Sequence, residues 1–454
     1  MRNEDYLLAA SANAGLFDQV ADLNVDVVVG NPPYLRLEDV PEDLSAEYRS
    51  RWPTMAGRAD VYIGFYERAL RSLKPGGRLA FICADRWMRN QYGGPLRKLI
   101  ADRYSVDVVW TLHDVDAFET SVSAYPAITI LSRGVQRAPV VAETNADFVA
   151  SSATELARWT LSSQKALAPP GPLDSVVATG YQGFRLPHWF PGDELWPAGT
   201  PERLALIDHL NNNFEPIHQP QKGTRVGIGV ATGADEVFIT TNRDLVELDR
   251  LLPLAMVSDT RSGHFEWGGR YLVNPWTQDG QPVDLREHPG LAAYFESHRG
   301  MLGRRYIARG GKRWYQTIDK VNWPLVHRPK LLIQDMRSAI NPVLEPGGHY
   351  PHHNLYHVVS DEWDMEVLGG LLLSLVAQAF IEAYCVRMRS GTLRFQAQYL
   401  KKIRVPRSRD IGADVSKALR DAFLSRDVTS ATRAAIVAYR LDRDGLDHVL
   451  MHNA

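Results

Sequence analysis

The first third of the chain alternates between continuous apolar runs and amphipathic segments, and this alternation constrains the fold more than any other feature. Four apolar runs have the length and β-branched content of buried strands: 25–30, 78–84, 106–112 and 127–133. Segments 59–73 and 93–104 carry apolar residues at helical spacing. We therefore expect an α/β domain with a buried, mostly parallel sheet and helices on both faces. The last two runs could form a β-hairpin that closes one edge of the sheet.

Composition excludes several classes of protein. The length of 454 residues predicts two or three domains. The formal net charge of −2 means that any nucleic-acid surface must be a local patch. Cys83 and Cys385 are the two cysteines, which argues against a disulfide framework and fits a reducing cytoplasm. No apolar run reaches the length of a membrane span and the N-terminus lacks a signal-peptide pattern, so we expect no membrane contact.

The alternating pattern weakens from about 139 to 201, where the run 169–172 (PPGP) is typical of a linker. A second region follows that is rich in Gly, Trp, Arg and short strand signals. We expect a first domain over 1–165, a second over 187–406 and a small helical tail over 410–454.

The turn Asn31-Pro32-Pro33-Tyr34 directly follows the apolar run 25–30. In open α/β sheets, ligands bind outside the carboxyl ends of the strands. The Asn31 side-chain oxygen and the Pro32 carbonyl can accept hydrogen bonds from one –NH₂ group and direct its lone pair outward. Tyr34 offers a flat face for the ring that bears this amine, which would be a base flipped out of its duplex. The alternative is a plain turn between a strand and the next element.

The run DVVVGNPPY (26–34) resembles the catalytic motif of S-adenosylmethionine-dependent amino-methyltransferases. Segment 59–100 is similar to the matching stretch of gamma-class adenine-specific DNA methyltransferases from type II restriction–modification systems. Segments 226–239 and 394–406 resemble the target-recognition domain of that class. The resemblance implies a Rossmann-like class I methyltransferase sheet followed by an α+β recognition domain. The tetrapeptide alone is less specific, because glutamine-modifying and guanine-modifying enzymes share it.

The resemblance also implies roles for individual residues. Asn31 and Pro32 would hold the target amino group, Tyr34 would stack on the flipped adenine, and Asn31 and Pro33 would also border the cofactor. Phe118 stands where the family places a second aromatic residue against the base, although a core position explains it equally well. Asp5 and Tyr6 match the acidic–aromatic pair that contacts the cofactor's adenine; the alternative is a helix cap or loop.

The family's glycine-rich strand–loop–helix, which holds the methionine part of S-adenosylmethionine, is not found upstream of Asp5. The run 227–233 (GIGVATG) is no substitute, because it lies in the second domain. We expect either that the start codon was set too late, that a second polypeptide supplies the loop, or that methylation has been lost.

Basic residues gather in two segments of the second domain. Residues 298–337 contain ten Lys/Arg and two acidic residues, with aromatic residues between them, and 386–407 contain seven Lys/Arg and no acid. Such clusters indicate surfaces that face DNA phosphates, the alternative being solvated basic faces. The candidates are Arg304, Arg305, Lys312, Arg313, Arg394, Lys401 and Lys402. The histidine-rich run 349–357 lacks an accompanying cysteine pair or carboxylate, so we expect no metal site.

We interpret the chain as a site-specific methyltransferase that uses S-adenosylmethionine to methylate the adenine amino group in double-stranded DNA. The alternatives are a catalytically incomplete DNA-binding subunit or remnant, and a methyltransferase acting on RNA or protein. A cognate restriction endonuclease is a further expected partner, whereas cleavage by this chain is not expected.

Overall fold

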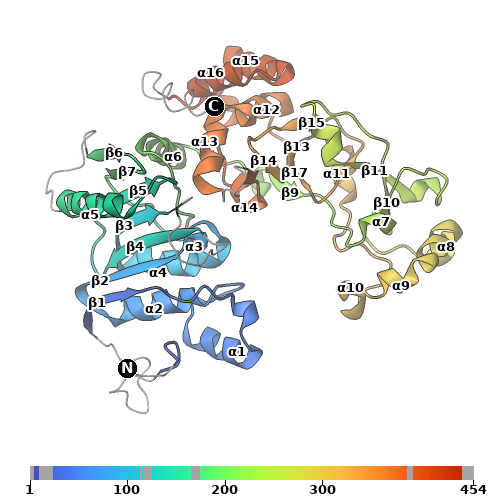
Figure 1. Cartoon of the computed structure of the whole chain (residues 1–454). Coiled ribbons are helices and arrows are strands. Elements are labelled where there is room, and N and C mark those ends of the chain that lie inside the picture. Colours follow the sequence, from blue (N-terminus) through green and yellow to red (C-terminus); the bar gives the residue numbers. More distant parts are fainter. Residues whose placement is uncertain are drawn as a thin grey trace. The chain divides into compact units, whose positions relative to one another are not determined.

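The computed structural model describes residues 5–9, 24–112, 115, 125–164, 174–385 and 392–441 (Figure 1). The chain divides into two compact units, Met1–Leu204 and Ala205–Ala454. The sequence places the end of the first domain at 165, but the sheet of the first unit continues to Arg185.

The first unit contains a seven-stranded sheet with the order β1-β2-β4-β3-β5-β7-β6. All four predicted apolar runs form strands in this sheet. The strands are β1 (Val25–Gly30), β2 (Leu73–Ala84), β3 (Ser105–Thr111), β4 (Pro126–Ser132), β5 (Val140–Thr144), β6 (Ser175–Ala178) and β7 (Tyr181–Arg185).

The expectation of a mostly parallel sheet is wrong, because the sheet is mixed. Among the described strand pairs of this seven-stranded sheet, only β1–β2 and β3–β5 are parallel. Strand β4 runs antiparallel between β2 and β3, so the predicted β3–β4 pair exists but lies inside the sheet. Three further strands, β5, β7 and β6, extend the sheet beyond it, in the segment where the sequence pattern weakens.

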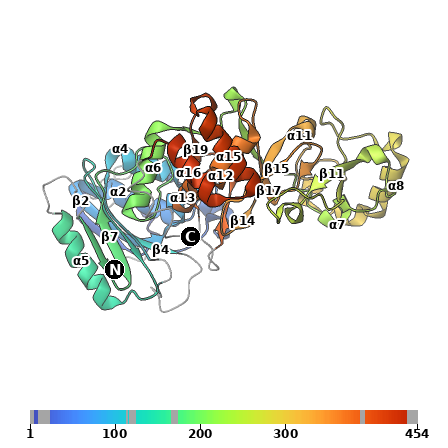
Figure 2. The same cartoon turned by 90° about the horizontal axis from the view of Figure 1, so that it is seen from above.

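Helices cover both faces of this sheet, as expected. The helices of the first unit are α1 (Glu42–Arg51), α2 (Tyr62–Ser72), α3 (Arg86–Arg89), α4 (Gly94–Arg103) and α5 (Ala150–Gln164), with α6 (Pro201–Asn213) at the junction of the units. On one face, Tyr66 of α2 donates to or accepts from the Thr129 hydroxyl at 2.8 Å. On the other, Leu156 of α5 packs with Val108 and Val140. Figure 2 shows α5 and the pair α2 and α4 on opposite sides of the strands.

The second unit contains two four-stranded sheets, β10-β12-β11-β16 and β15-β13-β17-β9. An apolar core that includes Phe238, Leu272 and Phe295 lies around the first of them. The strands of the unit are β8 (Glu215–Pro216), β9 (Arg225–Ile228), β10 (Ile239–Thr240), β11 (Leu251–Ala255), β12 (Tyr271–Val273), β13 (Lys330–Gln334), β14 (Met336–Arg337), β15 (Val343–Glu345), β16 (Tyr350–Pro351), β17 (Leu355–Val359), β18 (Leu393–Arg394) and β19 (Arg404–Val405).

The helices of the second unit are mostly short: α7 (Asp235–Phe238), α8 (Pro289–Ser297), α9 (Arg299–Leu302), α10 (Tyr306–Arg309), α11 (Trp323–His327), α12 (Met365–Leu373), α13 (Leu375–Tyr384), α14 (Ala397–Leu400), α15 (Ala413–Ser425) and α16 (Val428–Ala438). The apolar stretch around Val367 forms two buried helices, because Ser374 caps α13 and the chain bends by 63° there. Among the described residues no single helix could cross a membrane, although this bent pair passes by length and composition.

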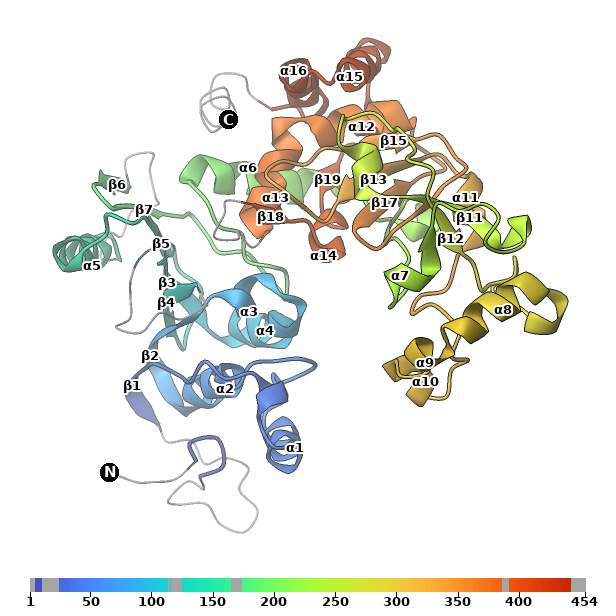
Figure 3. The ribbon, with the colours of Figure 1, turned by 45° about the vertical axis from the view of Figure 1, so that its right-hand side comes forward.

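The predicted helical tail forms α15 and α16, which are integral to the second unit. A Cβ added to Gly370 of α12 would lie 2.3 Å from the carbonyl oxygen of Leu419 in α15, so only glycine permits this approach of the two helices. A Cβ added to Gly369 would lie 2.5 Å from the Phe423 ring of α15. The helices therefore belong to the core of this unit, and α12, α15 and α16 lie side by side in Figures 1 and 3.

Candidate active site

The Asn-Pro-Pro-Tyr turn begins where β1 ends, and its first residue follows Gly30. Gly30 pairs in register with Phe81 of the parallel strand β2. A Cβ at residue 30 would stand 3.0 Å from the Phe81 ring, closer than side chains normally approach. Glycine thus lets the chain pass over this ring and turn out of the sheet at the strand's carboxyl end.

The four residues of the turn differ in exposure. Asn31 and Pro33 are exposed, Pro32 is buried and Tyr34 is half-buried. The hydroxyl oxygen of Tyr34 is itself buried, and burial together with the nearby Cys83 raises the pKa of this phenol. The Tyr34 phenol therefore stays neutral at physiological pH. Because Asn31 is exposed, its carboxamide is accessible to a ligand.

The turn is fastened to the start of α2. The Val61 amide donates to the Leu35 carbonyl at 2.8 Å, and Arg36 pairs with Asp60 in an isolated bridge. Asp60 accepts from the hydroxyls of Tyr62 at 2.7 Å and Tyr92 at 2.9 Å, and these two hydroxyls also lie 2.7 Å apart.

Sequence reasoning did not single out this carboxylate–phenol cluster, since Tyr92 is far from Asp60 in the chain. Burial and the neighbouring charge of Asp60 raise the pKa values of both phenols, so both remain proton donors.

The segment 5–9 lies against α1 and α2. The Asp5 carboxylate accepts from the Leu7 amide at 2.8 Å and from the Tyr48 hydroxyl at 2.5 Å. The Tyr6 ring stacks on Phe65 with centroids 4.9 Å apart, and the Arg68 guanidinium lies 4.6 Å from its centroid. Burial raises the pKa of Tyr6, and Arg68 opposes this shift.

Helix α2 is the element to which both parts of the candidate site attach. The Leu35 carbonyl accepts a hydrogen bond from the Val61 amide. The Tyr6 ring stacks on Phe65, about one helical turn further along the chain. The structure thus attaches Tyr6 and the Asn-Pro-Pro-Tyr turn to neighbouring turns of one helix. Tyr48, Phe65 and Arg68, which hold the segment, were not foreseen. Phe118 lies outside the described residues.

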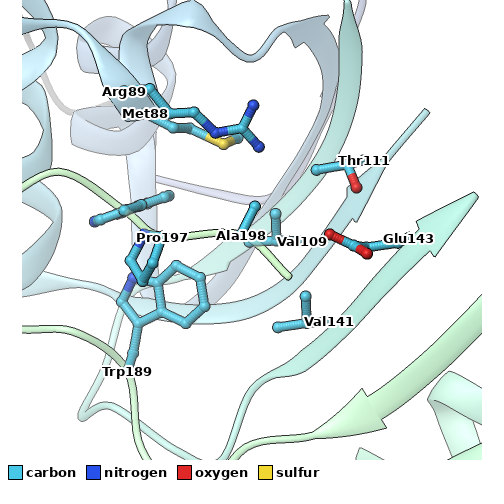
Figure 4. A pocket seen from close by; sticks show the side chains of 10 residues that line it. Met88, Arg89, Val109, Thr111, Val141, Glu143, Trp189, Pro197 and Ala198 are labelled. Carbon is cyan, nitrogen blue, oxygen red and sulfur yellow. The ribbon is translucent and has the colours of Figure 1, made fainter. Parts of the chain in front are cut away.

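A small pocket opens over β3 and β5, on the face of the sheet opposite α5 (Figure 4). Its aromatic wall is the pair Trp189 and Trp196, whose rings meet edge to face with centroids 5.0 Å apart. The lining residues are Met88, Arg89, Val109, Thr111, Val141, Glu143, Trp189, Trp196, Pro197 and Ala198. No residue of the Asn-Pro-Pro-Tyr turn lines the pocket, so it is distinct from the candidate base site.

Comparisons with known proteins agree with these features. The family model described as Eco57I restriction-modification methylase matches residues 6–118. Type II methyltransferase M.PaeR7I from Pseudomonas aeruginosa is 43% identical over 423 residues, which cover 92% of this chain and 71% of the relative. The chain belongs to the Eco57I-type restriction–modification methylases. Type II methyltransferase M.XhoI from Xanthomonas vasicola is 40% identical over 435 residues, which cover 93% of this methylase and 76% of the relative.

A solved structure shows the same fold. The type IIL restriction-modification enzyme MmeI, solved in complex with DNA, matches with a TM-score of 0.56 at 11% identity. The match covers 94% of the methylase, which thereby spans 58% of that enzyme's length.

The basic residues predicted to contact DNA all lie in the second unit of the methylase, in two separate places (Figure 3). Arg304, between α9 and α10, and Lys312 and Arg313, after α10, are exposed, and Tyr306 at the start of α10 is 70% exposed. The second group is on β18 and after α14. There the Arg394 side chain is half-exposed and 3.6 Å from the Asp335 carboxylate, and Lys401 and Lys402 are half-buried.

Arg305 differs from the other candidates, because its guanidinium is bonded inside the unit. It donates to the carbonyls of Thr232 at 2.9 Å, Trp314 at 2.8 Å and Gln316 at 2.6 Å. Its carbon Cζ also lies 5.2 Å from the centroid of the Phe238 ring. These contacts support a structural role, so we leave Arg305 out of the proposed DNA surface.

Proposed function

We propose that this methylase transfers a methyl group from S-adenosylmethionine to the exocyclic amino group of adenine at a specific sequence in double-stranded DNA. The observation that carries the proposal is the accessible Asn31 carboxamide, placed at a strand's carboxyl end between a rigid proline pair and the half-buried ring of Tyr34. This arrangement suits an amine on a flat ring.

In the proposed reaction, the Asn31 side-chain oxygen and the Pro32 carbonyl each accept a hydrogen bond from one N–H of the amino group. This withdraws the nitrogen lone pair from the ring and points it at the methyl donor. Bound S-adenosylmethionine would supply the methyl group, its S–C bond breaking as the N–C bond forms, and the surplus proton would leave the methylated nitrogen for solvent. The neutral Tyr34 ring stacks on the extruded base and fixes its plane.

The segment 5–9 fits the adenine end of the methyl donor. Asp5 is exposed and Tyr6 is half-buried, and each Asp5 carboxylate oxygen, although it accepts one internal hydrogen bond, has a second lone pair. S-adenosylmethionine supplies an electrophilic methyl group when bound. We propose that Asp5 accepts from its adenine amino group and that Tyr6 packs on its ring.

The test is a methyl-transfer assay on unmethylated genomic DNA, with the chain alone and with a glycine-rich cofactor segment supplied, followed by nucleoside mass spectrometry. We expect N6-methyladenine at discrete sites and protection of those sites from a cognate restriction endonuclease. Methylcytosine alone would refute the adenine assignment, and methylated RNA or protein without methylated DNA would refute the DNA assignment.

The exposed edge strand β1 indicates where the missing part of the cofactor site would attach. Among the described strands β1 is terminal, and its Val27 and Val29 are 60% and 76% exposed on the same face. Exposed valines on an edge strand favour pairing with another segment. We infer that this edge receives a segment carrying the glycine-rich cofactor loop, on this polypeptide or on a second one.

We therefore expect the 454-residue chain alone to bind S-adenosylmethionine weakly in calorimetry. Supplying a strand and a glycine-rich loop, fused to the chain or as a second polypeptide, should strengthen binding at least tenfold, since poor positioning of the methionine end forfeits most of the affinity. The double variant Val27→Lys/Val29→Lys should abolish this gain. Val177→Lys is the matched control, because Val177 is 82% exposed on β6 at the opposite edge. Tight binding and many turnovers by the chain alone would contradict the inference.

Sequence-specific DNA binding should reside in the second unit, through the exposed basic residues near α10. The triple variant Arg304→Ala/Lys312→Ala/Arg313→Ala should weaken binding to all DNA sequences and reduce the salt slope of log affinity by about 2 to 3, because each lost phosphate contact releases one counterion fewer. Titrations by fluorescence anisotropy at several salt concentrations measure this slope. The control variant Lys417→Ala/Arg433→Ala removes exposed charges on α15 and α16, elsewhere in the unit, and should leave the salt slope unchanged. An unchanged slope in the triple variant would place the DNA surface elsewhere.

A further inference from the structure

Three side chains that can bind metals meet in the second unit. Asp235 opens α7, and His352 and His353 directly follow β16, so the folded chain joins positions 117 residues apart in sequence. One potential ligand atom of each residue lies within 4.8 Å of those of the other two. The two imidazole rings are tilted, with centroids 4.1 Å apart.

The hydrogen bonds of this cluster leave ring nitrogens unused. His352 Nε2 is 3.1 Å from Asp235 Oδ2, and the Thr232 hydroxyl donates to the other carboxylate oxygen. Nδ1 of His352 and Nδ1 of His353 are buried without a hydrogen-bond partner among the described residues. His352 as a whole is 1% exposed. A buried imidazole nitrogen without a partner is costly, and a cation bound at Nδ1 of His353 would offset that cost.

We propose that Asp235, His352 and His353 form a binding site for a divalent transition metal, with Zn²⁺ as the best-fitting ion. Imidazole nitrogens and a carboxylate oxygen are ordinary zinc ligands, and at bond lengths of about 2.0–2.1 Å their atoms stand about 3.3 Å apart. The separation of 3.1 Å between His352 and Asp235 already matches that spacing. The half-exposed Asp235 side chain gives the ion a path from solvent, and water completes the coordination.

The ionisation of the cluster agrees with the site. Burial, with the neighbouring His353, lowers the pKa of His352, which favours the neutral ring, and a neutral imidazole offers one nitrogen lone pair to a metal. Asp235 is ionised: burial alone would raise its pKa, but the hydrogen bond from Thr232 and the interactions with His352 outweigh it and lower the pKa.

The site would join two loops next to the predicted DNA surface. Val230 pairs with His352 in an isolated bridge, and the Ala231 amide donates to Asp319 at 2.9 Å. Thr232, which bonds Asp235, receives Arg305 on its carbonyl. A metal at Asp235 would therefore fix the loop around Thr232, to which Arg305 is bonded. The main effect of metal binding would be on the stability of this unit.

Sequence reasoning rejected a metal site in 349–357 because no carboxylate accompanies the histidines there. Folding supplies the carboxylate from α7. A pattern search confined to one segment cannot recognise ligands that come from two.

The test uses the full chain without an affinity tag, stripped by a chelator and titrated with Zn²⁺ against a chromophoric competitor. We expect one tight site per chain. Asp235→Asn and His353→Ala should each weaken Zn²⁺ affinity at least tenfold. Glu236→Gln, beside Asp235, and His264→Ala, an exposed histidine of the same unit, should leave the affinity unchanged.

Two further measurements guard against misfolded variants. Zn²⁺ should raise the melting temperature of the wild-type chain and of both control variants, but not that of Asp235→Asn. Co²⁺ bound to the wild-type chain should show the visible absorption of a tetrahedral site. No stoichiometric Zn²⁺ binding, or equal loss in site and control variants, would overturn the proposal.

Discussion

Replacing Asn31 with alanine should abolish methyl transfer in the methylation-competent enzyme while DNA binding survives. The hydrogen bonds to the amino group strengthen as its nitrogen becomes a nucleophile, so the loss should appear in the chemical step. Removing one such group from an active site costs on the order of a hundredfold to a thousandfold in turnover. Single-turnover kinetics with S-adenosylmethionine and a duplex containing the target site measure this step directly.

Tyr34 provides a graded companion to this experiment. Tyr34→Ala should be severely impaired because it loses the stacking face, whereas Tyr34→Phe keeps the ring and should be milder. Gln91→Ala removes an exposed amide from the same unit and should behave as the wild type. If Asn31→Ala turned over at nearly the normal rate, the proposed role of the turn would be wrong.

Lys330→Met should destabilise the second unit by about 3–5 kcal/mol, because it leaves a buried carboxylate without its cation. Lys330 on β13 and Glu345 on β15 are cross-strand partners, and neither side chain is exposed to solvent. Glu345 also interacts with Nδ1 of His349 at 2.9 Å and accepts from the Gly347 amide at 2.9 Å. Urea unfolding followed by tryptophan fluorescence measures the change.

The double variant Lys330→Met/Glu345→Leu tests the cause. Replacing both charges by apolar side chains of similar size removes the uncompensated carboxylate, so most of the lost stability should return. Lys417→Met breaks the exposed pair with Asp421 and should cost less than about 1 kcal/mol. A double variant as unstable as Lys330→Met would show that packing around the lysine stem, and not charge, explains the effect.

The strands with strong local signals could be predicted from the sequence, whereas strand directions could not. The runs at β1 and β3 are dominated by valine, so they indicate strands without reference to any neighbour. β7 (YQGFR) carries no such signal, and it is a strand because it pairs with both β5 and β6. The antiparallel direction of β4 is likewise a property of the assembled sheet.

In the candidate site, too, residues with a local sequence signal could be predicted, whereas their long-range partners could not. The Asn-Pro-Pro-Tyr turn is contiguous and follows a clear strand, so its residues could be found by reading. The support of Tyr6 by Phe65 and Arg68 joins positions about 60 residues apart, and nothing local marks those partners. Arg305 was assigned to DNA by its neighbours in sequence, whereas its guanidinium is occupied by three carbonyl groups.

The glycine pair of α12 determines where this protein can be divided for experiments. Gly369 and Gly370 form a groove that Leu419 and Phe423 of α15 fill at near-contact distance. A fragment that stops near Pro406 would open this groove to water and remove the apolar side chains that close it. Fragments made to map DNA recognition should therefore extend through α16 to Leu441, and a weak result from a shorter fragment would reflect an unfolded core rather than a missing DNA contact.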